Sequence, residues 1–219
     1  MGRPMAEWLA WLTGCAGLLV TACVPYKPTL LLEKSPDTIP VSVSVQPLRD
    51  ATPPDDKENL AADTISQTGS MEGELSALVT QAIEADFSAT SLFRSISQGE
   101  PHPDLILSGT IHRFYGQATL LSWVIPGVGW TVNAVVSPVQ AWQGEVDLEL
   151  TLARPNGQVL GAYRGHATYQ ELADHDSRYW SMPLYPAHAR LNQAFTEAVQ
   201  HIREQMLRDR SLLAAGLSN

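Results

Sequence analysis

The feature that most restricts the fold is an alternating segment in the second half of the chain. Residues 145–152 read Glu-Val-Asp-Leu-Glu-Leu-Thr-Leu, so every second side chain is apolar. Neighbouring side chains of a strand point to opposite sides of a sheet, and the pattern therefore predicts a strand with one buried and one solvated face. A Pro-Asn-Gly turn at 155–157 and the returning arm Val159–Tyr169 complete a hairpin. Such a sheet needs a covering layer on one face only.

Two amphipathic segments can supply that layer. Between Leu75 and Phe87, apolar residues recur at helical spacing, and Ser70 is placed to cap the helix. A second helix is predicted over residues 187–208. Its apolar stripe consists of Leu191, Ala194, Phe195, Ala198, Val199 and Ile202.

Two further strands are predicted at Val41–Val45 and Asp104–Tyr115. We therefore expect a single α+β domain over residues 40–210. It would have two layers, with an antiparallel or mixed sheet of about four to five strands and two amphipathic helices packed on one face. The polar, acidic residues 51–70 are expected to form a surface loop, and the tail beyond Arg210 carries no strong structural signal.

The amino-terminal residues read as a targeting segment. Residues 8–19 are almost wholly apolar, too short a run to span a bilayer but suited to a signal peptide. The following Val-Thr-Ala-Cys ends at Cys23 and resembles the bacterial lipobox, which implies a lipoprotein signal peptide over residues 1–22. Cys23 would then carry a diacylglycerol and an N-acyl chain, palmitate included, on a lipidated tether over residues 23–39. Cys15 is a second match with a shorter apolar run, and a plain cleaved signal, an uncleaved anchor or an ordinary buried cysteine are the alternatives.

A long uncharged stretch is the candidate contact region. No charged side chain occurs from Phe114 to Gly144, and we treat 116–142 as an apolar insert in the domain. Three interpretations remain open: a pair of buried strands, a surface for a partner or for self-association, or a loop that enters the lipid leaflet. The predicted partner- or membrane-binding residues are Trp123, Val124, Ile125, Val128, Trp130 and Trp142.

Composition and motifs argue against several functions. The 23 acidic residues outnumber the 14 basic ones, which disfavours nucleic-acid binding. The six histidines lack metal-site spacing, although His175, Asp176 and His188 could approach one another, and the acidic 51–70 segment lacks the spacing of a calcium loop. No Gly-x-Ser-x-Gly motif or phosphate-binding glycine loop is present. We therefore expect neither catalysis, a metal nor a cofactor, the lipid on Cys23 aside.

The order of elements resembles that of small periplasmic domains of bacterial envelope lipoproteins: the TolB amino-terminal type, LpoB, PelC and YajG-like proteins. Four features carry this resemblance: Val41–Pro47 after the tether, the Leu75–Phe87 helix, Leu92-Phe93, and Asp104–Gly109 opening a strand. It implies an α+β domain on the periplasmic face of the outer membrane, the destination that Val24 after the cysteine also implies by lipoprotein sorting rules.

The function expected from these observations is a non-enzymatic, membrane-anchored binding or scaffold module in an envelope export or assembly system. Its partners would be the membrane, through the lipid anchor, and envelope proteins or further copies of itself. The alternative is a periplasmic small-ligand carrier or enzyme with a site near the 174–188 loop, whose Tyr179, Trp180 and Tyr185 could line a pocket.

Overall fold

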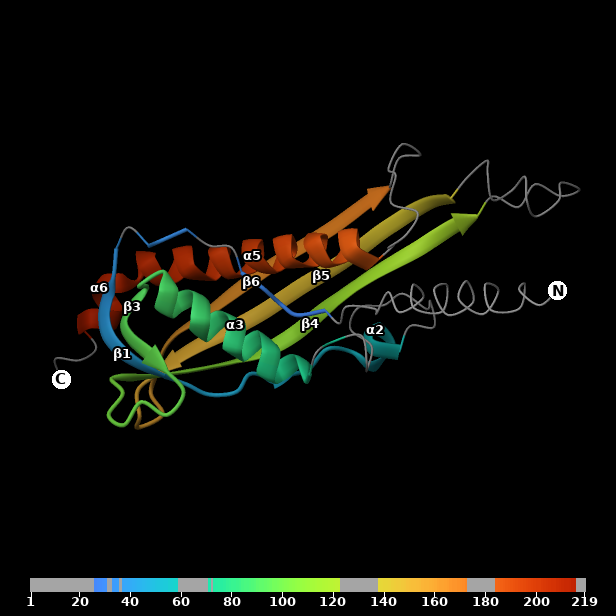
Figure 1. The fold of residues 1–219 in the computed structure, drawn as a ribbon. Coiled ribbons are helices and arrows are strands. Elements are labelled where there is room, and N and C mark those ends of the chain that lie inside the picture. The colour runs from blue at the N-terminus through green and yellow to red at the C-terminus, as the bar shows by residue number, and fades with distance from the viewer. Residues whose placement is uncertain are drawn as a thin grey trace, which may run out of the picture.

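The computed structural model describes residues 26–30, 33–35, 37–58, 71, 73–122, 138–172 and 184–215 (Figure 1). These residues form a mixed α+β fold with six strands and four helices. The strands are β1 (Ile39–Val45), β2 (Arg49–Asp50), β3 (Phe93–Ser97), β4 (Leu105–Ser122), β5 (Pro138–Ala153) and β6 (Val159–Leu172). The helices are α2 (Pro54–Glu58), α3 (Leu75–Ala89), α5 (Leu184–Arg208) and α6 (Arg210–Ala215).

The sheet is mixed, with strand order β3-β1-β4-β5-β6 and the short β2 paired to β4. The pairs β1–β3, β1–β4 and β2–β4 are parallel, whereas β4, β5 and β6 form an antiparallel meander. The Pro-Asn-Gly hairpin is present, with Gly157 at φ 88°. A register shift between Ile111 and Arg113 allows Ile111 and Phe114 both to be buried, although they are three residues apart.

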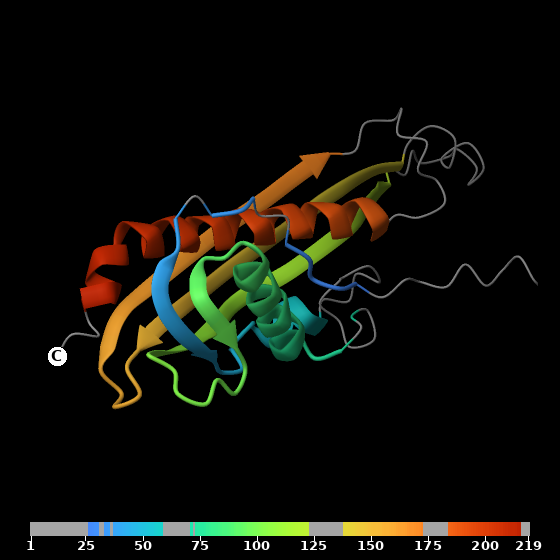
Figure 2. The same ribbon diagram turned by 60° about the vertical axis from the view of Figure 1, so that its left-hand side comes forward.

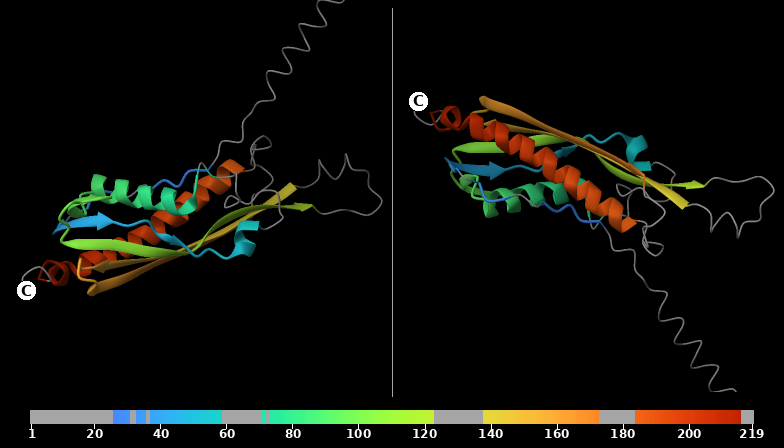
Figure 3. Two further views of the ribbon diagram at one scale, coloured as in Figure 1. Left: turned by 90° about the horizontal axis from the view of Figure 1, so that it is seen from below. Right: turned by 90° about the horizontal axis from the view of Figure 1, so that it is seen from above.

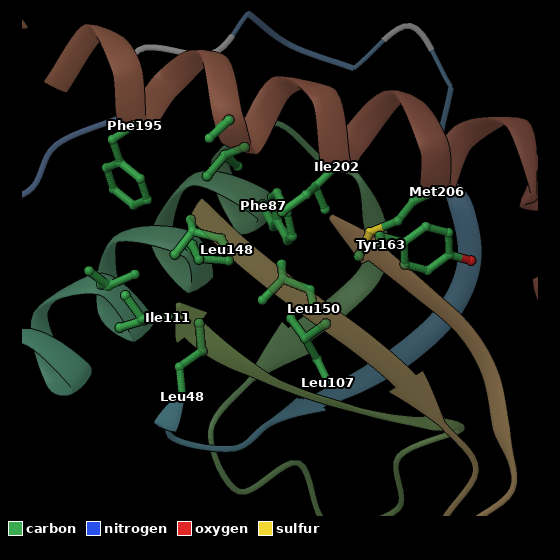
Figure 4. Packing of buried hydrophobic residues seen from close by; sticks show 14 of the residues in the cluster. Leu48, Phe87, Leu107, Ile111, Leu148, Leu150, Tyr163, Phe195, Ile202 and Met206 are labelled. Atoms are coloured by element: carbon green, nitrogen blue, oxygen red, sulfur yellow. The ribbon is translucent and has the colours of Figure 1, made fainter. Parts of the chain in front are cut away.

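The two long helices lie on the same side of the meander (Figures 2 and 3). Phe195, Ile202 and Met206 of α5 and Phe87 of α3 meet Leu148 and Leu150 of β5 in one core (Figure 4). The alternation in β5 is as predicted, because Val146, Leu148, Leu150 and Leu152 are all fully buried. The opposite face of the meander carries the polar side chains and, at its edge, the short helix α2 (Figure 3).

Four elements differ from the expectation. The strands β4 and β5 continue into the predicted insert, paired as far as Ser122 and Pro138. Leu92-Phe93 leads into a strand, β3, rather than only adding core residues beyond the helix. The segment 51–70, expected as a loop, contains α2. The tail beyond Arg210 forms α6, because Leu213 finds a fully buried site.

None of the helices in the described part of the chain is both long enough and apolar enough to cross a membrane.

Candidate functional site: the docked amino-terminal segment and the end of the sheet beside it

Most of the predicted site lies outside the described residues. This holds for Cys23 and for Trp123, Val124, Ile125, Val128 and Trp130. The remaining predicted residue, Trp142, lies in β5, where only 6% of its surface is exposed. Its side chain belongs to the hydrophobic core of this chain, and this differs from the expectation that it is offered to a partner. At Trp142 the interpretation that fits is therefore the buried strand.

The most deeply placed residue of the predicted tether is Tyr26. Its side chain is 1% exposed, and its hydroxyl donates a hydrogen bond of 2.7 Å to Oδ1 of Asn192 on α5. Its ring centroid lies 5.2 Å from that of His188 and 6.3 Å from that of Phe114. The tether is therefore docked at its fourth residue rather than free there. The only sequence signal for this was an aromatic residue in a proline-containing segment.

The segment after Tyr26 stays in contact with the domain. The amide of Thr29 also donates to Oδ1 of Asn192, at 3.1 Å. The guanidinium of Arg203, a residue that is 4% exposed, donates to the carbonyl oxygen of Glu33 at 2.6 Å. The amide of Ser35 donates to the carbonyl of Thr90 at 3.0 Å. These bonds fasten the segment to both α5 and the end of α3.

The docking site favours neutral groups. Burial, with the nearby Tyr169 as a second cause, raises the pKa of Tyr26 well above that of a free tyrosine. Burial lowers the pKa of His188, so its uncharged form is favoured against the Tyr26 ring. Asn192 can accept both hydrogen bonds without carrying charge. The site is therefore suited to holding the Tyr26 side chain in its uncharged form at neutral pH.

The polar face of the meander carries a lattice of ion pairs. Arg113 of β4 contacts Asp56 of α2 at 2.6 Å and Glu145 of β5 at 2.7 Å. Its positive charge is held by these carboxylates, which raise its pKa. The adjacent pair Arg164–Asp147, at 2.5 Å, lowers the pKa of Asp147 mainly through hydrogen bonds. This arrangement fixes α2 and rigidifies the exposed face.

The same lattice includes two histidine–carboxylate contacts. His166 approaches Glu145 at 3.1 Å, and His112 approaches Glu149 at 3.2 Å. Within the described ranges, no group of three or more histidine, cysteine or acidic side chains is arranged to hold a metal ion. The carboxylates of Glu145, Asp147 and Glu149 are instead paired with arginine or histidine side chains of the neighbouring strands.

Charge ends abruptly along β4 and β5. Arg113 and Glu145 are the last charged residues before the turn, and Tyr115 is the register partner of Glu145. Beyond them the two strands remain paired through residues 116–122 and 138–144, a segment that we call the β-arm. Figure 1 shows that β4 and β5 extend past the start of α5. The docked Tyr26 contacts Phe114, at the base of this arm.

Among the grooves formed by the described residues, two bear on a ligand site. One, of about 430 Å³, lies beside β3 and the end of α3 and is lined by Thr38, Phe93 and Arg94 among others. The other, of about 370 Å³, lies between β6 and α5 and includes the ion pair Arg190–Glu171. Of the aromatic residues proposed for a carrier site, Tyr179 and Trp180 lie outside the described residues, as does the Tyr185 side chain.

No protein-family model matches the sequence, and neither does any curated protein. Among solved structures, a DUF330-family protein from Xanthomonas campestris aligns over 90% of this chain and 100% of its own, with 12% identity and a TM-score of 0.50. PelC from Paraburkholderia phytofirmans, solved as a dodecamer, aligns over 78% and 93%, with 11% identity and a TM-score of 0.33. A candidate lipoprotein from Caulobacter crescentus aligns over 67% and 85%, with 16% identity and a TM-score of 0.35. What this chain has in common with the Xanthomonas protein is therefore its fold.

Proposed function

We propose that this chain is a non-enzymatic lipoprotein of the bacterial envelope, anchored by acyl chains on Cys23. It would act as a binding or scaffold module in an export or assembly system on the periplasmic face of the outer membrane. The observation that carries the proposal is the docking of Tyr26. The folded domain begins three residues after the lipobox cysteine, so cleavage before Cys23 leaves an amino terminus with almost no slack.

Anchoring would contribute directly to binding. A protein fixed to a membrane meets its envelope partners in two dimensions, and this raises its effective concentration at the partner. Two or more acyl chains give stable attachment, whereas one gives only marginal binding. The uncharged segment with Trp123 and Trp130 is the proposed contact region for a partner or a second copy.

The acylation of Cys23 is tested on the mature protein extracted from its membrane. The mass of its amino-terminal peptide is measured by mass spectrometry. We expect a peptide that begins at Cys23 with added diacylglycerol and N-acyl mass, and a Cys23→Ala variant that no longer fractionates with the outer membrane. A peptide that begins elsewhere, or an unmodified Cys23, would contradict the proposal.

The scaffold role is tested by crosslinking in intact envelopes. Trp130→Glu is compared with Val159→Glu, a matched control that changes a 58%-exposed apolar residue at the start of β6. We expect crosslinks to envelope proteins or to further copies in the wild type and the control, and their loss in Trp130→Glu with the fold intact. Unchanged crosslinks, or a globally unfolded Trp130→Glu, would remove the support for this contact region.

The second candidate is a carrier of a small polar ligand. The groove between β6 and α5 favours it, because a volume of about 370 Å³ lies at the lower end of the range for small-molecule sites. It is flanked by the chain on both sides of the 174–188 loop, through Glu171 and Arg190. A protein that gives no crosslinks and is indifferent to Trp130→Glu would favour this function.

A further inference from the structure

We infer that the outer part of the β-arm, residues 118–122 and 138–141, is the element that contacts the lipid bilayer, so that the domain is held with this end toward the membrane. The inference rests on the proposed lipid anchor and adds to it an orientation and a contact surface. Its first basis is length. Tyr26 is the third residue after Cys23, and an extended chain spans at most about 3.6 Å per residue. The acylated cysteine therefore stays within about 11 Å of the buried Tyr26.

The second basis is the place where Tyr26 is docked. Its contacts are Phe114 at the base of the β-arm and His188 and Asn192 in the first part of α5. The other end of the molecule, with the β5–β6 turn and α6, lies at the far end of α5 (Figures 1 and 2). From Asn192 to Arg208 the helix advances about 24 Å, at 1.5 Å per residue. We call residues 23–26 the leash. With its reach of about 11 Å, the leash cannot bring that far end to the bilayer while α5 stands perpendicular to the membrane.

The third basis is the reach of the arm compared with the leash. From Phe114 to Ser122 an extended strand advances about 26 Å, at 3.3 Å per residue. This exceeds the reach of the leash by more than a factor of two. The arm begins beside the point where the leash is docked and is longer than the leash. When the arm points toward the membrane, its end therefore reaches the lipid surface.

The fourth basis is chemical. The arm carries no charged residue on β4 or β5, while Arg113, Glu145, Asp147 and Glu149 follow immediately on the other side of its base. The neighbouring β6 contributes Glu171, whose charge is paired with Arg190 at 2.6 Å. Charged groups are strongly disfavoured in the hydrocarbon region, so this uncharged end can approach the lipid at a lower cost than the charged remainder of the sheet. The change from charged to uncharged residues, at Arg113 and Glu145, therefore lies next to Phe114, where Tyr26 and the leash are docked.

The test places one label at each end of the acylated protein. With Cys23 consumed by lipid, Thr119→Cys on the β-arm or Asn156→Cys in the β5–β6 turn supplies the single free thiol for a bimane probe. Each protein is reconstituted into phosphatidylethanolamine–phosphatidylglycerol vesicles that contain lipids brominated along their acyl chains. We expect at least threefold stronger quenching of the probe at 119 than at 156.

A leash variant tests the geometry separately. Inserting ten Gly/Ser residues between Val24 and Pro25 adds a flexible span of about 17 Å, and we expect it to reduce the quenching at 119. Both labelled proteins must keep the urea midpoint of the parent. Equal or absent quenching at 119 and 156 in a protein of confirmed acyl mass would overturn the orientation. Absence of the acyl mass would instead overturn the proposed anchor.

Discussion

At the scale of single residues, the docking of Tyr26 is the contact that would link the proposed anchor to the fold. Its ring is enclosed by side chains from β4 and α5, and its hydroxyl shares Asn192 with the backbone of Thr29. A tyrosine used in this way performs two tasks, because the ring fills a core position while the hydroxyl fixes the direction of the chain.

Substitution of Tyr26 separates these two tasks. Tyr26→Ala removes a fully buried ring and should lower the free energy of unfolding by about 3 kcal/mol or more. Tyr26→Phe keeps the ring, and Asn192 keeps the Thr29 donor, so the loss should be about 1 kcal/mol. Urea unfolding of the two variants measures the difference. Equal effects would mean that the ring contributes little.

The half-buried histidine beside Tyr26, His188, predicts a dependence of stability on pH. Because burial lowers the pKa of His188, the folded chain binds this proton less readily than the unfolded chain. Stability should therefore fall as the pH drops below about 6.5, the ordinary histidine value. The lowered carboxyl pKa values of Asp104 and Asp147 act in the same direction only near pH 4 and below.

The measurement is the free energy of unfolding at pH 7.5 and 5.5. The drop between these values should be smaller in His188→Asn than in the wild type. The control is His201→Asn, which changes an exposed residue of the same helix. A drop of the same size in all three proteins would show that His188 does not cause it.

At the scale of elements, the packing of α5 on β6 depends on a small residue. A Cβ added to Gly165 would collide with the carbonyl group of Ala198 on the helix and lie 3.0 Å from Ile202. The helix backbone therefore approaches the strand at this point more closely than any other residue would permit. This approach is what allows the α5 stripe to reach into the core of the sheet.

Gly165→Ala should force α5 away from β6 and lower the free energy of unfolding by about 1–3 kcal/mol. Gly73→Ala is the matched control, because the nearest atom to its added Cβ is Leu78 Cγ at an ordinary 3.9 Å. We expect the control to remain within about 0.5 kcal/mol of the wild type. Denaturant unfolding followed by circular dichroism compares them, and equal stability of the two variants would refute the packing argument.

At the scale of the whole molecule, charge and apolar surface are separated along the sheet. The polar face of the meander is covered with ion pairs such as Arg164–Asp147, whereas the β-arm beyond Glu145 is uncharged. In this pair Arg164 is largely exposed while Asp147 is buried. The ion pairs keep this face polar, and the uncharged end is the proposed contact region.

Removal of the docked segment tests whether it belongs to the domain. A chain that begins at residue 24 should unfold at a clearly higher urea concentration than one that begins at residue 37. The longer chain keeps the burial of Tyr26 and the hydrogen bonds from Arg203 to Glu33 and from Ser35 to Thr90. Identical midpoints would mean that residues 24–36 are only a tether, as the sequence alone suggested.

The sequence by itself determined the local elements and their buried faces. Strand alternation in Val146–Leu152 and the helical stripe from Leu191 to Ile202 are local patterns, and each names its own apolar side. They were enough to predict an α+β domain with helices on one face of a sheet. They also pointed to an uncharged segment and to a lipobox cysteine.

Tertiary structure decided what depends on partners distant in sequence. Tyr26 is buried by residues more than 80 positions away, and the strand β3 exists because β1 supplies its parallel partner. The helix α6 forms where Leu213 meets the core, and Trp142 is buried because β5 continues beneath the packed layer. None of these residues carries a local periodic signal, since the free energy that fixes them comes from long-range burial. The sequence therefore specified which faces of the helices and strands must be buried. Only the assembled fold determined which distant residues cover those faces.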